Sequence, residues 1–421
     1  MNKEDIKPVG TVDTVVSVPG SKSLTQRAMV IAALAEGQSV LTHGLVSEDT
    51  RYLMEGLRAL GADITLSDDR MVVTGTGGSI KPPEGAIFLG NNGTALRFLT
   101  TLVALGKGIF TLDGEPRLRE RPVGPLLEAL KALGVSAATQ DGKGYPPIVI
   151  EADGLPGGNV TLTDIESSQF VSSLLISAPY AREDMEIRLK GRVVSEPYVD
   201  MTLNIMESFG VKISRVEGKR FRVKCGQRYA GRSFLVEGDA SSASYFFLAA
   251  ALCRGRIRVE NMTSDSLQGD IGLLEIIESA GCAVTRGDSW IEVTGGQLRT
   301  GECVLNMGGM PDMVPTVAVL AAFRPGHTVI TNVAHLRIKE SDRIAAMVNE
   351  LNRMGVTAKE TEDGLTVDGG TPHGAEIETY NDHRIAMSFA VAGLVVPGVQ
   401  IKNRNCVNKS FPGFWDELKK L

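Results

Sequence analysis

The feature that most constrains the fold of this chain is a sixfold repetition. Short polar segments lead into apolar runs at residues 22, 93, 168, 241, 312 and 382, so successive starts are 70 to 75 residues apart. A fixed period of this size is the signature of a repeated supersecondary unit. We therefore expect six similar units, with polar starts at Ser21-Lys22, Asn92-Gly93, Ser167-Ser168, Ser241-Ser242, Asp312 and Asp382-His383.

Each unit also carries a second, amphipathic helix that stops at a glycine. Glycine is the expected residue just past a helix end, because it reaches the left-handed conformation without a Cβ penalty. The sixth such helix is expected at Phe414–Leu421, and short β-rich runs such as Ala62–Leu66 follow the helix pairs. The pattern predicts α/β units, whose helix-ending glycines are Gly61, Gly134, Gly210, Gly281 and Gly355.

Length and charge narrow the organisation and the kind of partner. A chain of 421 residues exceeds what one hydrophobic core usually organises, so six units divide most naturally into two similar domains of three. The net charge is −6, with 44 basic and 50 acidic residues interspersed. This balance does not favour nucleic acid or an anionic membrane surface as a partner. A small-molecule ligand is expected instead.

Cysteine usage and hydropathy indicate the compartment. The five cysteines are far apart and odd in number, without metal-ligand spacing or a disulfide framework, so we expect free thiols, no metal and a reducing cytoplasm. The segment Met1–Val9 lacks the features of a signal or transit peptide. The apolar runs Val314–Phe323 and Ile385–Val396 fall short of the roughly 18 residues that span a bilayer, so they are expected to be buried helices.

Several polar starts carry cations where a helix dipole is positive. Lys22, Ser23 and Arg27 occupy the first turns of the first expected helix, which favours an anion there. Arg121 follows two other arginines and precedes Pro122, which suits a first helical position and would place Arg121 at the mouth of a helix. The alternative is that these arginines pair with surface carboxylates such as Glu120.

Other starts allow two interpretations. Asn91, Asn92 and Gly93 either bring backbone close to a ligand or form a plain capped turn. Hydroxyl and amide groups at further starts are either ordinary caps or groups that read sugar hydroxyls or a phosphate. These are Ser167, Ser168, Gln169, Ser195 and Tyr198. The segment Gly238–Ser244 is interpreted mainly as a hinge followed by a cap.

The last units hold the carboxylates that could move protons. Asp312 opens an apolar helix, where a carboxylate is usually only a cap. Lys339, Glu340 and Arg343 stand ahead of the next helix, and His383, Arg384 and Lys409 mark the sixth unit. If the repeats are arranged alike, the cations at these helix N-termini converge on a site for at least two anionic groups, with Asp312 and Glu340 able to move protons. This predicts a transferase or lyase that acts on phosphorylated, carboxylated small molecules.

These motifs resemble those of the 5-enolpyruvylshikimate-3-phosphate synthases (3-phosphoshikimate 1-carboxyvinyltransferases) of the enolpyruvyl transferase family, over essentially the whole chain. The motifs are Pro-Gly-Ser-Lys-Ser at 19–23, Leu-Gly-Asn-x-Gly-Thr-Ala at 89–95, Arg-Glu-Arg-Pro at 119–122, Ser-Ser-Gln-Phe at 167–170, Lys-Glu-Ser-Asp-Arg at 339–343 and Asn-Asp-His-Arg at 381–384. The resemblance implies two domains of three βαβαββ units each. The first would cover 19–238, and the second 1–18 together with 239–421.

The resemblance also implies a reaction in the shikimate pathway to chorismate and aromatic amino acids. The enolpyruvyl group of phosphoenolpyruvate passes to the 5-hydroxyl of shikimate 3-phosphate in a cytoplasmic monomer that uses no cofactor. Matching motifs assign shikimate 3-phosphate to Lys22, Ser23, Arg27, Ser167, Ser168, Gln169, Ser195, Tyr198, Asp312 and Lys339. They assign phosphoenolpyruvate to Lys22, Gly93, Arg121, Gln169, Arg343, Arg384 and Lys409. Asp312 would be the base and Glu340, with Lys22, the acid, while Asn91 and His383 would support the site.

Two departures and two rivals stand beside this resemblance. Many family members carry Ala where this chain has Asn92 and Pro where it has Phe98, which bears on the phosphoenolpyruvate pocket and on inhibition by glyphosate. The related transferase acting on UDP-N-acetylglucosamine usually has a reactive Cys or Asp before the Arg-Pro helix, and here 110–121 offers only Asp113. A non-catalytic anion-binding protein would explain the cations but not Asp312 and Glu340.

Overall fold

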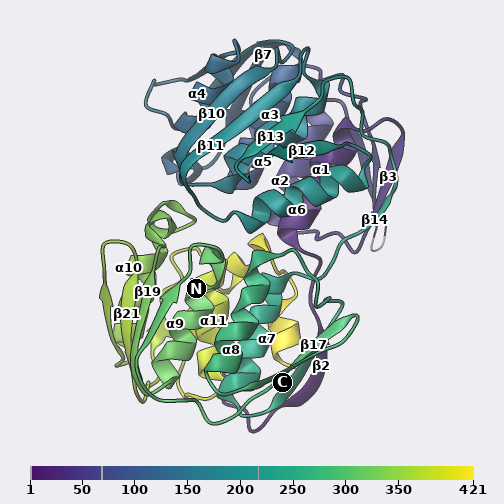
Figure 1. Cartoon of the computed structure of the whole chain (residues 1–421). Coiled ribbons are helices and arrows are strands. Elements are labelled where there is room, and N and C mark those ends of the chain that lie inside the picture. The colour runs from purple at the N-terminus through teal and green to yellow at the C-terminus, as the bar shows by residue number, and fades with distance from the viewer. Residues whose placement is uncertain (1, 68–69, 217) are drawn as a thin grey trace. The chain divides into compact units, whose positions relative to one another are not determined.

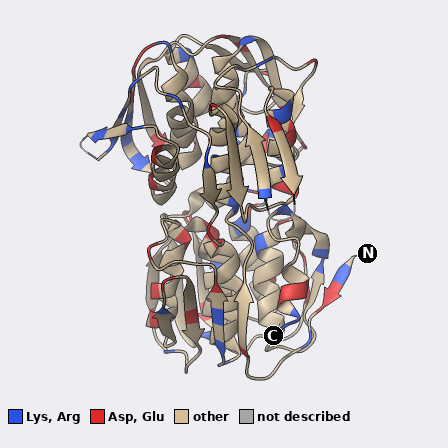
Figure 2. Cartoon of the chain, turned by 90° about the vertical axis from the view of Figure 1, so that its right-hand side faces the viewer, with Lys and Arg blue, Asp and Glu red and all other residues tan. Residues whose placement is uncertain are grey.

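The chain forms two compact units, each with its own hydrophobic core. The structure is a computed structural model that describes residues 2–67, 70–216 and 218–421. We call residues 22–236 the N-terminal unit and residues 1–21 with 237–421 the C-terminal unit. These limits lie a few residues from the expected boundaries. The elements are labelled in Figure 1, and basic and acidic residues are interspersed along both units in Figure 2.

The N-terminal unit alternates helices and strands. Its helices are α1 (Lys22–Leu34), α2 (Glu48–Ala59), α3 (Gly93–Leu102), α4 (Gly124–Ala132), α5 (Ser168–Ser177) and α6 (Pro197–Ser208). Its strands are β3 (Gln38–Thr42), β4 (Asp63–Ser67), β5 (Arg70–Thr74), β6 (Ile87–Phe88), β7 (Lys107–Asp113), β8 (Ser136–Thr139), β9 (Ile148–Asp153), β10 (Gly158–Ile165), β11 (Met185–Val193), β12 (Ile213–Val216), β13 (Arg220–Val223) and β14 (Ser233–Leu235).

The C-terminal unit follows the same alternation. Its helices are α7 (Ala240–Leu252), α8 (Leu273–Ser279), α9 (Val314–Phe323), α10 (Arg343–Arg353), α11 (His383–Gly393) and α12 (Phe414–Leu418). Its strands are β1 (Lys3–Asp5), β2 (Asp13–Ser17), β15 (Arg256–Glu260), β16 (Ala283–Arg286), β17 (Trp290–Thr294), β18 (Cys303–Asn306), β19 (Gly326–Thr331), β20 (Thr357–Glu360), β21 (Leu365–Gly369), β22 (Glu376–Ile377) and β23 (Gln400–Lys402).

The sheets repeat one strand order. In the order β6-β7-β9-β8, the first two strands are parallel and the rest antiparallel, with α3 and α4 as the intervening helices. The orders β10-β11-β13-β12 and β18-β19-β21-β20 repeat this pattern. The predicted α/β fold of two similar domains built from βαβαββ units is therefore confirmed.

Three sheets include a strand from a distant part of the chain. The first sheet of the N-terminal unit has the order β14-β3-β5-β4, with β14 parallel to β3. In the C-terminal unit, β2 pairs in parallel with β15. The sheet of the sixth repeat has the order β1-β23-β22, in which β1 lies antiparallel to β23. Each unit is thus closed by strands that the local repeat does not supply.

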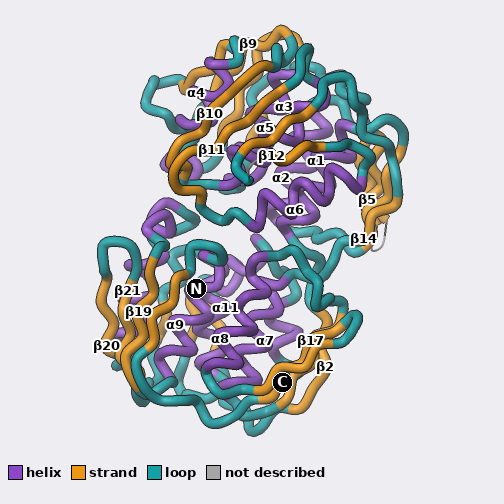
Figure 3. The backbone as a smooth tube through the Cα atoms, in the orientation of Figure 1, coloured by secondary structure: helices purple, strands orange, loops and turns teal. Residues whose placement is uncertain are grey.

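The helices lie inside each unit and the strands lie outside (Figure 3). In the C-terminal unit, α7, α9 and α11 pack against one another, and almost all of their residues are buried. A helix that is apolar all round has to be buried, which explains why these runs carry so few charges. The expectation of buried helices at Val314–Phe323 and Ile385–Val396 agrees with this packing. In the part of the chain that the structure describes, we find no helix with the length and apolar character to cross a membrane.

The helix-ending glycines adopt the predicted conformation. Gly61, Gly134, Gly210, Gly281 and Gly355 all have positive φ, between 79° and 111°. The sixth second helix, α12, ends at Leu418 rather than Leu421. The segments that connect the two units, near 18–21 and 236–239, run antiparallel, with a bridge between Gly20 and Gly238.

A glycine-to-alanine pair tests the helix-ending role. Gly210 has a φ of 93° and open space around its Cα, so Gly210→Ala should lower the free energy of unfolding by about 1–2 kcal/mol through backbone strain alone. Gly85→Ala is the matched control, because Gly85 has equal space and no positive φ. Urea unfolding of both variants measures the effect. Equal midpoints for the two variants would contradict the role.

Candidate functional site

In the C-terminal unit, Asp312 lies between two arginines. Arg343 Nη1 lies 2.8 Å from Asp312 Oδ1, and Arg384 Nη2 lies 2.7 Å from Asp312 Oδ2. Asp312 sits in the 3₁₀ turn Pro311–Met313 just before α9, while Arg343 and Arg384 are the first and second residues of α10 and α11. The three helix starts therefore meet at one carboxylate. The repeat thus brings the equivalent starts of α9 and α11 together with the start of α10.

Arg343 is almost wholly buried and is surrounded by carboxylates. Its side chain is 1% exposed, its Nη2 lies 2.8 Å from Glu340 Oε2, and its Nε lies 2.8 Å from Asp382 Oδ2. Burial acts to lower the pKa of Arg343, but Asp382, Glu340 and Asp312 outweigh it and hold the pKa above its ordinary value. Asp382 also caps α11 through Arg384 N and accepts a hydrogen bond from Ser341. One buried carboxylate thus joins the starts of α10 and α11.

Arg384 is held by a second chain of contacts. Its Nη2 donates to Ser241 Oγ at 3.2 Å, and Ser241 donates to Asp270. Burial, followed by the nearby Asp312, raises the pKa of Asp270 to about 6. The sequence predicts a mainly structural role for Ser241, whereas the structure places Ser241 in contact with Arg384.

Asp312 is the most accessible of the carboxylates on Arg343. Its side chain is 26% exposed, compared with 10% for Glu340 and 0% for Asp382. Burial acts to raise the pKa of Asp312, but Arg384 and then Arg343 outweigh it and hold the pKa below its ordinary value. Asp312 is therefore ionised at neutral pH.

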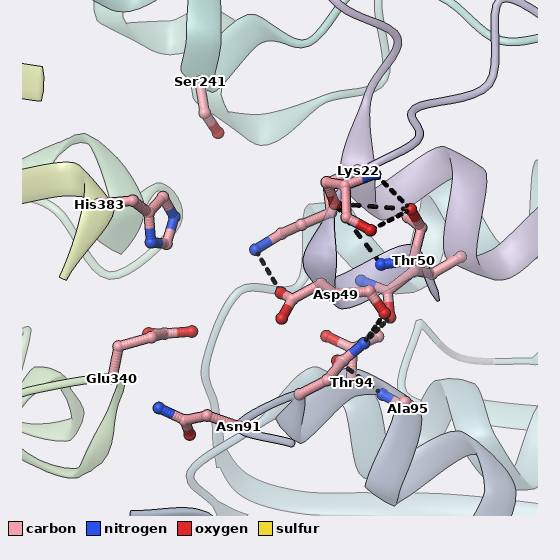
Figure 4. Close-up of polar contacts among 12 residues, drawn as sticks. Lys22, Asp49, Thr50, Asn91, Thr94, Ala95, Ser241, Glu340 and His383 are labelled. Atoms are coloured by element: carbon pink, nitrogen blue, oxygen red, sulfur yellow. Dashed lines mark hydrogen bonds and ion pairs between the residues drawn. The ribbon is translucent and has the colours of Figure 1, made fainter. Parts of the chain in front are cut away.

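In the N-terminal unit, Lys22 begins α1 and contacts the start of α2. Its Nζ lies 3.1 Å from Asp49 Oδ2, as Figure 4 shows. Asn92 caps α3 through Ala95 N, and its amide donates to the Asp49 carbonyl at 2.7 Å and to Gln26 Oε1 at 2.8 Å. The Lys22 side chain is thus held by a carboxylate whose backbone is itself fixed by Asn92.

Gly93 makes room for Arg121. A Cβ on Gly93 would lie 2.5 Å from Arg121 Cζ, and Arg121 Nη1 lies 3.4 Å from the Asn91 carbonyl. The guanidinium is therefore packed against the start of α3, where positive φ is not the reason for glycine. Arg121 is 4% exposed.

Pro122 does not occupy the first position of a helix, so this prediction is wrong. Helix α4 begins at Gly124, and Arg121 ends the 3₁₀ turn Leu118–Glu120. Two of the arginines in this segment pair with surface carboxylates: Arg117 with Glu120 and Arg119 with Asp113. The surface alternative therefore holds for these two arginines, while Arg121 is buried.

Gln169, on α5, is held by two side chains of α3. Arg97 Nη1 donates to Gln169 Oε1 at 2.6 Å, and Gln169 Nε2 donates to Thr94 Oγ1 at 2.9 Å. Arg97 is 4% exposed and was not predicted as a site residue. An arginine inside an otherwise apolar helix was the signal that could have identified it.

Arg27 lies against two aromatic rings. Its guanidinium carbon is 5.3 Å from the Phe98 ring centre and 5.6 Å from that of Tyr198, and its Nε donates to Thr202 at 2.8 Å. Burial lowers the pKa of Arg27 to about 10. Arg27 is thus a buried cation in the second turn of α1.

The remaining predicted residues are placed as follows. Ser167 caps α5 and is followed by Ser168, while Ser195 has a φ of 57° just before α6. His383 begins α11 and is 1% exposed. The expectation that all the cations lie at helix N-termini is correct for Lys22, Arg343 and Arg384. It is wrong for Arg121, Lys339 and Lys409, which lie in or beside 3₁₀ turns. Arg27 lies in the second turn of α1, within the first turns where it was expected. Asp312 is also not an N-cap, since Met313 holds that place.

The cysteines and the acidic side chains are the groups that could form disulfides or hold a metal ion. All five cysteines are free, as predicted. Within residues 2–67, 70–216 and 218–421, no three His, Cys, Asp or Glu side chains are grouped so that they could hold a metal ion.

Comparisons with known proteins agree over the full length. The family model described as EPSP synthase (3-phosphoshikimate 1-carboxyvinyltransferase) matches residues 6–418. A 3-phosphoshikimate 1-carboxyvinyltransferase of Nostoc punctiforme is 44% identical over 96% of this chain and 95% of its own. That of Escherichia coli is 41% identical over 100% and 99%. The solved EPSP synthase of Acinetobacter baumannii has a TM-score of 0.83 and 28% identity, and it covers 99% of this chain and 98% of its own.

A pH-dependent stability difference tests the environment of Asp270. Because its folded pKa of about 6 lies above the ordinary 3.8, its ionisation costs stability as the pH rises from about 4 to 6. Asp270 faces Ser241, Arg384, Asp312 and Asp239. Asp270→Asn should therefore gain stability relative to the unchanged protein between pH 4.5 and pH 7, on the order of 1–3 kcal/mol. Melting temperatures at both pH values measure this, and a constant difference would contradict it.

Proposed function

The chain belongs to the EPSP synthase (3-phosphoshikimate 1-carboxyvinyltransferase) family, and we propose how its residues carry out the reaction. The reaction transfers the enolpyruvyl group of phosphoenolpyruvate to the 5-hydroxyl of shikimate 3-phosphate and releases phosphate, in the shikimate pathway. The observation that carries the proposed roles is the ionised, partly exposed Asp312 between Arg343 and Arg384. It combines a proton acceptor with two fixed cations.

The arginines are suited to the anions of phosphoenolpyruvate. A guanidinium presents parallel N–H donors that match a carboxylate or phosphate, and burial strengthens such contacts. Arg343 and Arg384 are already held in place by Asp382 and Ser241, so little ordering is left for the ligand to cause. The residues proposed for phosphoenolpyruvate are Lys22, Gly93, Arg121, Gln169, Arg343, Arg384 and Lys409.

Neutral donors and further cations are suited to shikimate 3-phosphate. Hydroxyl and amide groups beside helix starts can form hydrogen bonds with the hydroxyl groups of the substrate, while Lys22 and Arg27 supply positive charge for its phosphate. The residues proposed for shikimate 3-phosphate are Lys22, Ser23, Arg27, Ser167, Ser168, Gln169, Ser195, Tyr198, Asp312 and Lys339. Asn91 and His383 support the site.

Asp312 would accept the proton of the 5-hydroxyl of shikimate 3-phosphate while the oxygen of that hydroxyl forms a bond to C2 of phosphoenolpyruvate. Glu340, with Lys22, would give a proton to the methylene carbon, which forms a tetrahedral adduct. Loss of phosphate together with a proton from the methyl group then restores the double bond. In the absence of substrate, Arg384 and Arg343 hold the pKa of Asp312 low. A substrate anion on these arginines would offset their charge, raise that pKa and make Asp312 a stronger base.

The domains, assembly and location complete the proposal. We assign the first catalytic domain to 19–238 and the second to 1–18 with 239–421, because the chain crosses between its units near Gly20 and Gly238. We assign a monomer, in which each unit has its own hydrophobic core. The free thiols support a reducing cytoplasm.

The transferase acting on UDP-N-acetylglucosamine is the alternative within the fold. Its candidate reactive residue here, Asp113, receives hydrogen bonds from Arg119 at 2.9 and 2.6 Å. That pairing engages both carboxylate oxygens of Asp113. The shikimate reaction is favoured over this alternative and over a non-catalytic anion-binding protein.

Phosphate release provides the direct test. The purified protein should release phosphate from phosphoenolpyruvate only when shikimate 3-phosphate is present. UDP-N-acetylglucosamine in its place should give none. Release with the nucleotide sugar, or no release with either acceptor, would overturn the proposed function.

Replacing Asp312 should affect turnover more than folding. Asp312→Ala removes the proposed base, and we expect at least a hundredfold loss in kcat, the lower end of what general-base catalysis contributes. Steady-state kinetics and thermal melting on the same preparation measure both properties. Near-normal kcat in a folded Asp312→Ala protein would contradict the base role.

The cysteines should be dispensable for turnover. Burial raises the pKa of Cys253 to about 11 and that of Cys406 to about 12, so both remain thiols at neutral pH. Each Cys→Ser variant should keep kcat within about threefold of the unchanged protein, since the thiolate is the nucleophilic form. Loss of turnover in a well-folded single variant would indicate a covalent cysteine mechanism.

A further inference from the structure

Glu350 is a fully buried carboxylate outside the proposed site. It lies on α10, seven residues after Arg343, and its side chain is 0% exposed. The spacing of seven places both side chains on one face of the helix, about 10 Å apart along its axis. A buried carboxylate is costly unless its oxygens accept hydrogen bonds, so its partners indicate its role.

Two of its partners belong to the turn that precedes α11. Glu350 Oε2 accepts a hydrogen bond from Glu378 N at 3.1 Å, and Oε1 accepts one from the Tyr380 hydroxyl at 2.9 Å. A third contact comes from Arg353 Nε at 3.0 Å. Arg353 is 52% exposed, so this ion pair does not account for the burial of Glu350.

The turn held by Glu350 is strained. Tyr380 and Asn381 are consecutive non-glycine residues with φ of 54° and 55°. Such conformations persist when their surroundings fix them. Immediately after the turn come Asp382, which accepts from Arg343, and Arg384, which pairs with Asp312. The backbone of this turn therefore sets where Arg384 stands relative to Arg343.

We propose that Glu350 is a positioning residue for the anion-binding arginines, because its two carboxylate oxygens fix the left-handed turn that places Asp382 and Arg384 against Arg343. Helix α10 thus holds the start of α11 at two points, through Arg343–Asp382 and through Glu350 with Glu378 and Tyr380. The role needs a hydrogen-bonding group against each of these two partners, an acceptor for Glu378 N and a donor or acceptor for the Tyr380 hydroxyl, and not a negative charge. This inference rests on the proposed binding of phosphoenolpyruvate by Arg343 and Arg384.

Four variants test the role by steady-state kinetics, with each substrate varied in turn, and by thermal melting. Tyr380→Phe removes one contact, and we expect about a tenfold rise in the KM for phosphoenolpyruvate with less than threefold change in the KM for shikimate 3-phosphate. Glu350→Leu, which removes both acceptors, should raise the same KM further. Glu350→Gln keeps an acceptor oxygen for Glu378 N and turns an NH2 toward the Tyr380 hydroxyl, which can accept from it, so the KM for phosphoenolpyruvate should stay within about threefold of the unchanged protein.

Arg353→Gln is the matched control. It removes the exposed partner of Glu350 and leaves the contacts with the turn, so it should lower the melting temperature without changing either KM. If Tyr380→Phe keeps a KM for phosphoenolpyruvate within twofold of the unchanged protein, the positioning role is overturned, whether or not Glu350→Leu folds. Equal effects of Glu350→Gln and Glu350→Leu would also overturn it, because they would assign the role to charge.

Arg384→Lys separates this inference from the proposed function. If Arg384→Lys raises the KM for phosphoenolpyruvate and Tyr380→Phe does not, only the role of Glu350 fails. If Arg384→Lys leaves that KM unchanged, the proposed assignment of Arg384 fails, and the inference about Glu350 fails with it.

Discussion

The burial of arginine in the C-terminal unit is the constraint on which the rest of the site depends. A buried guanidinium left without a partner would cost roughly 3–5 kcal/mol. Arg343 meets this requirement with Asp312, Glu340 and Asp382. The contact with Arg343 also helps to keep the partly exposed Asp312 ionised, as the proposed role of Asp312 as a proton acceptor requires.

The repeated architecture explains how these groups come together. Each repeat starts its helices at equivalent points of a common strand order. Residues about seventy positions apart in the sequence therefore lie next to one another. Arg384 and Asp312 are 72 positions apart, as are Ser244 and Thr316, which also touch. Helix dipoles at these starts add to the pull on anions. The cluster around Asp312, which we propose as a binding site, is therefore a consequence of the repeat and does not come from one local motif.

Structural features that recur in each repeat could be predicted from the sequence, and features that occur only once could not. The period, the positive-φ glycines such as Gly210 and the starts of α10 and α11 follow from local patterns. The 3₁₀ turns beside Arg121 and Lys409 do not, because a short turn has no periodicity of its own. Long-range pairs were also missed: nothing in the Ser241 segment indicates Arg384, which lies 143 positions away.

The two departures from the family pattern can be placed in this framework. Asn92 caps α3 and holds the backbone of Asp49, the partner of Lys22. Phe98 lies against the guanidinium of Arg27. Neither residue changes the packing of Arg121 against Gly93, because that packing depends only on the absence of a Cβ at residue 93. The departures therefore act on Lys22, which is proposed for both substrates, and on Arg27, which is proposed for shikimate 3-phosphate. Arg121, which packs against Gly93, keeps the geometry that glycine provides.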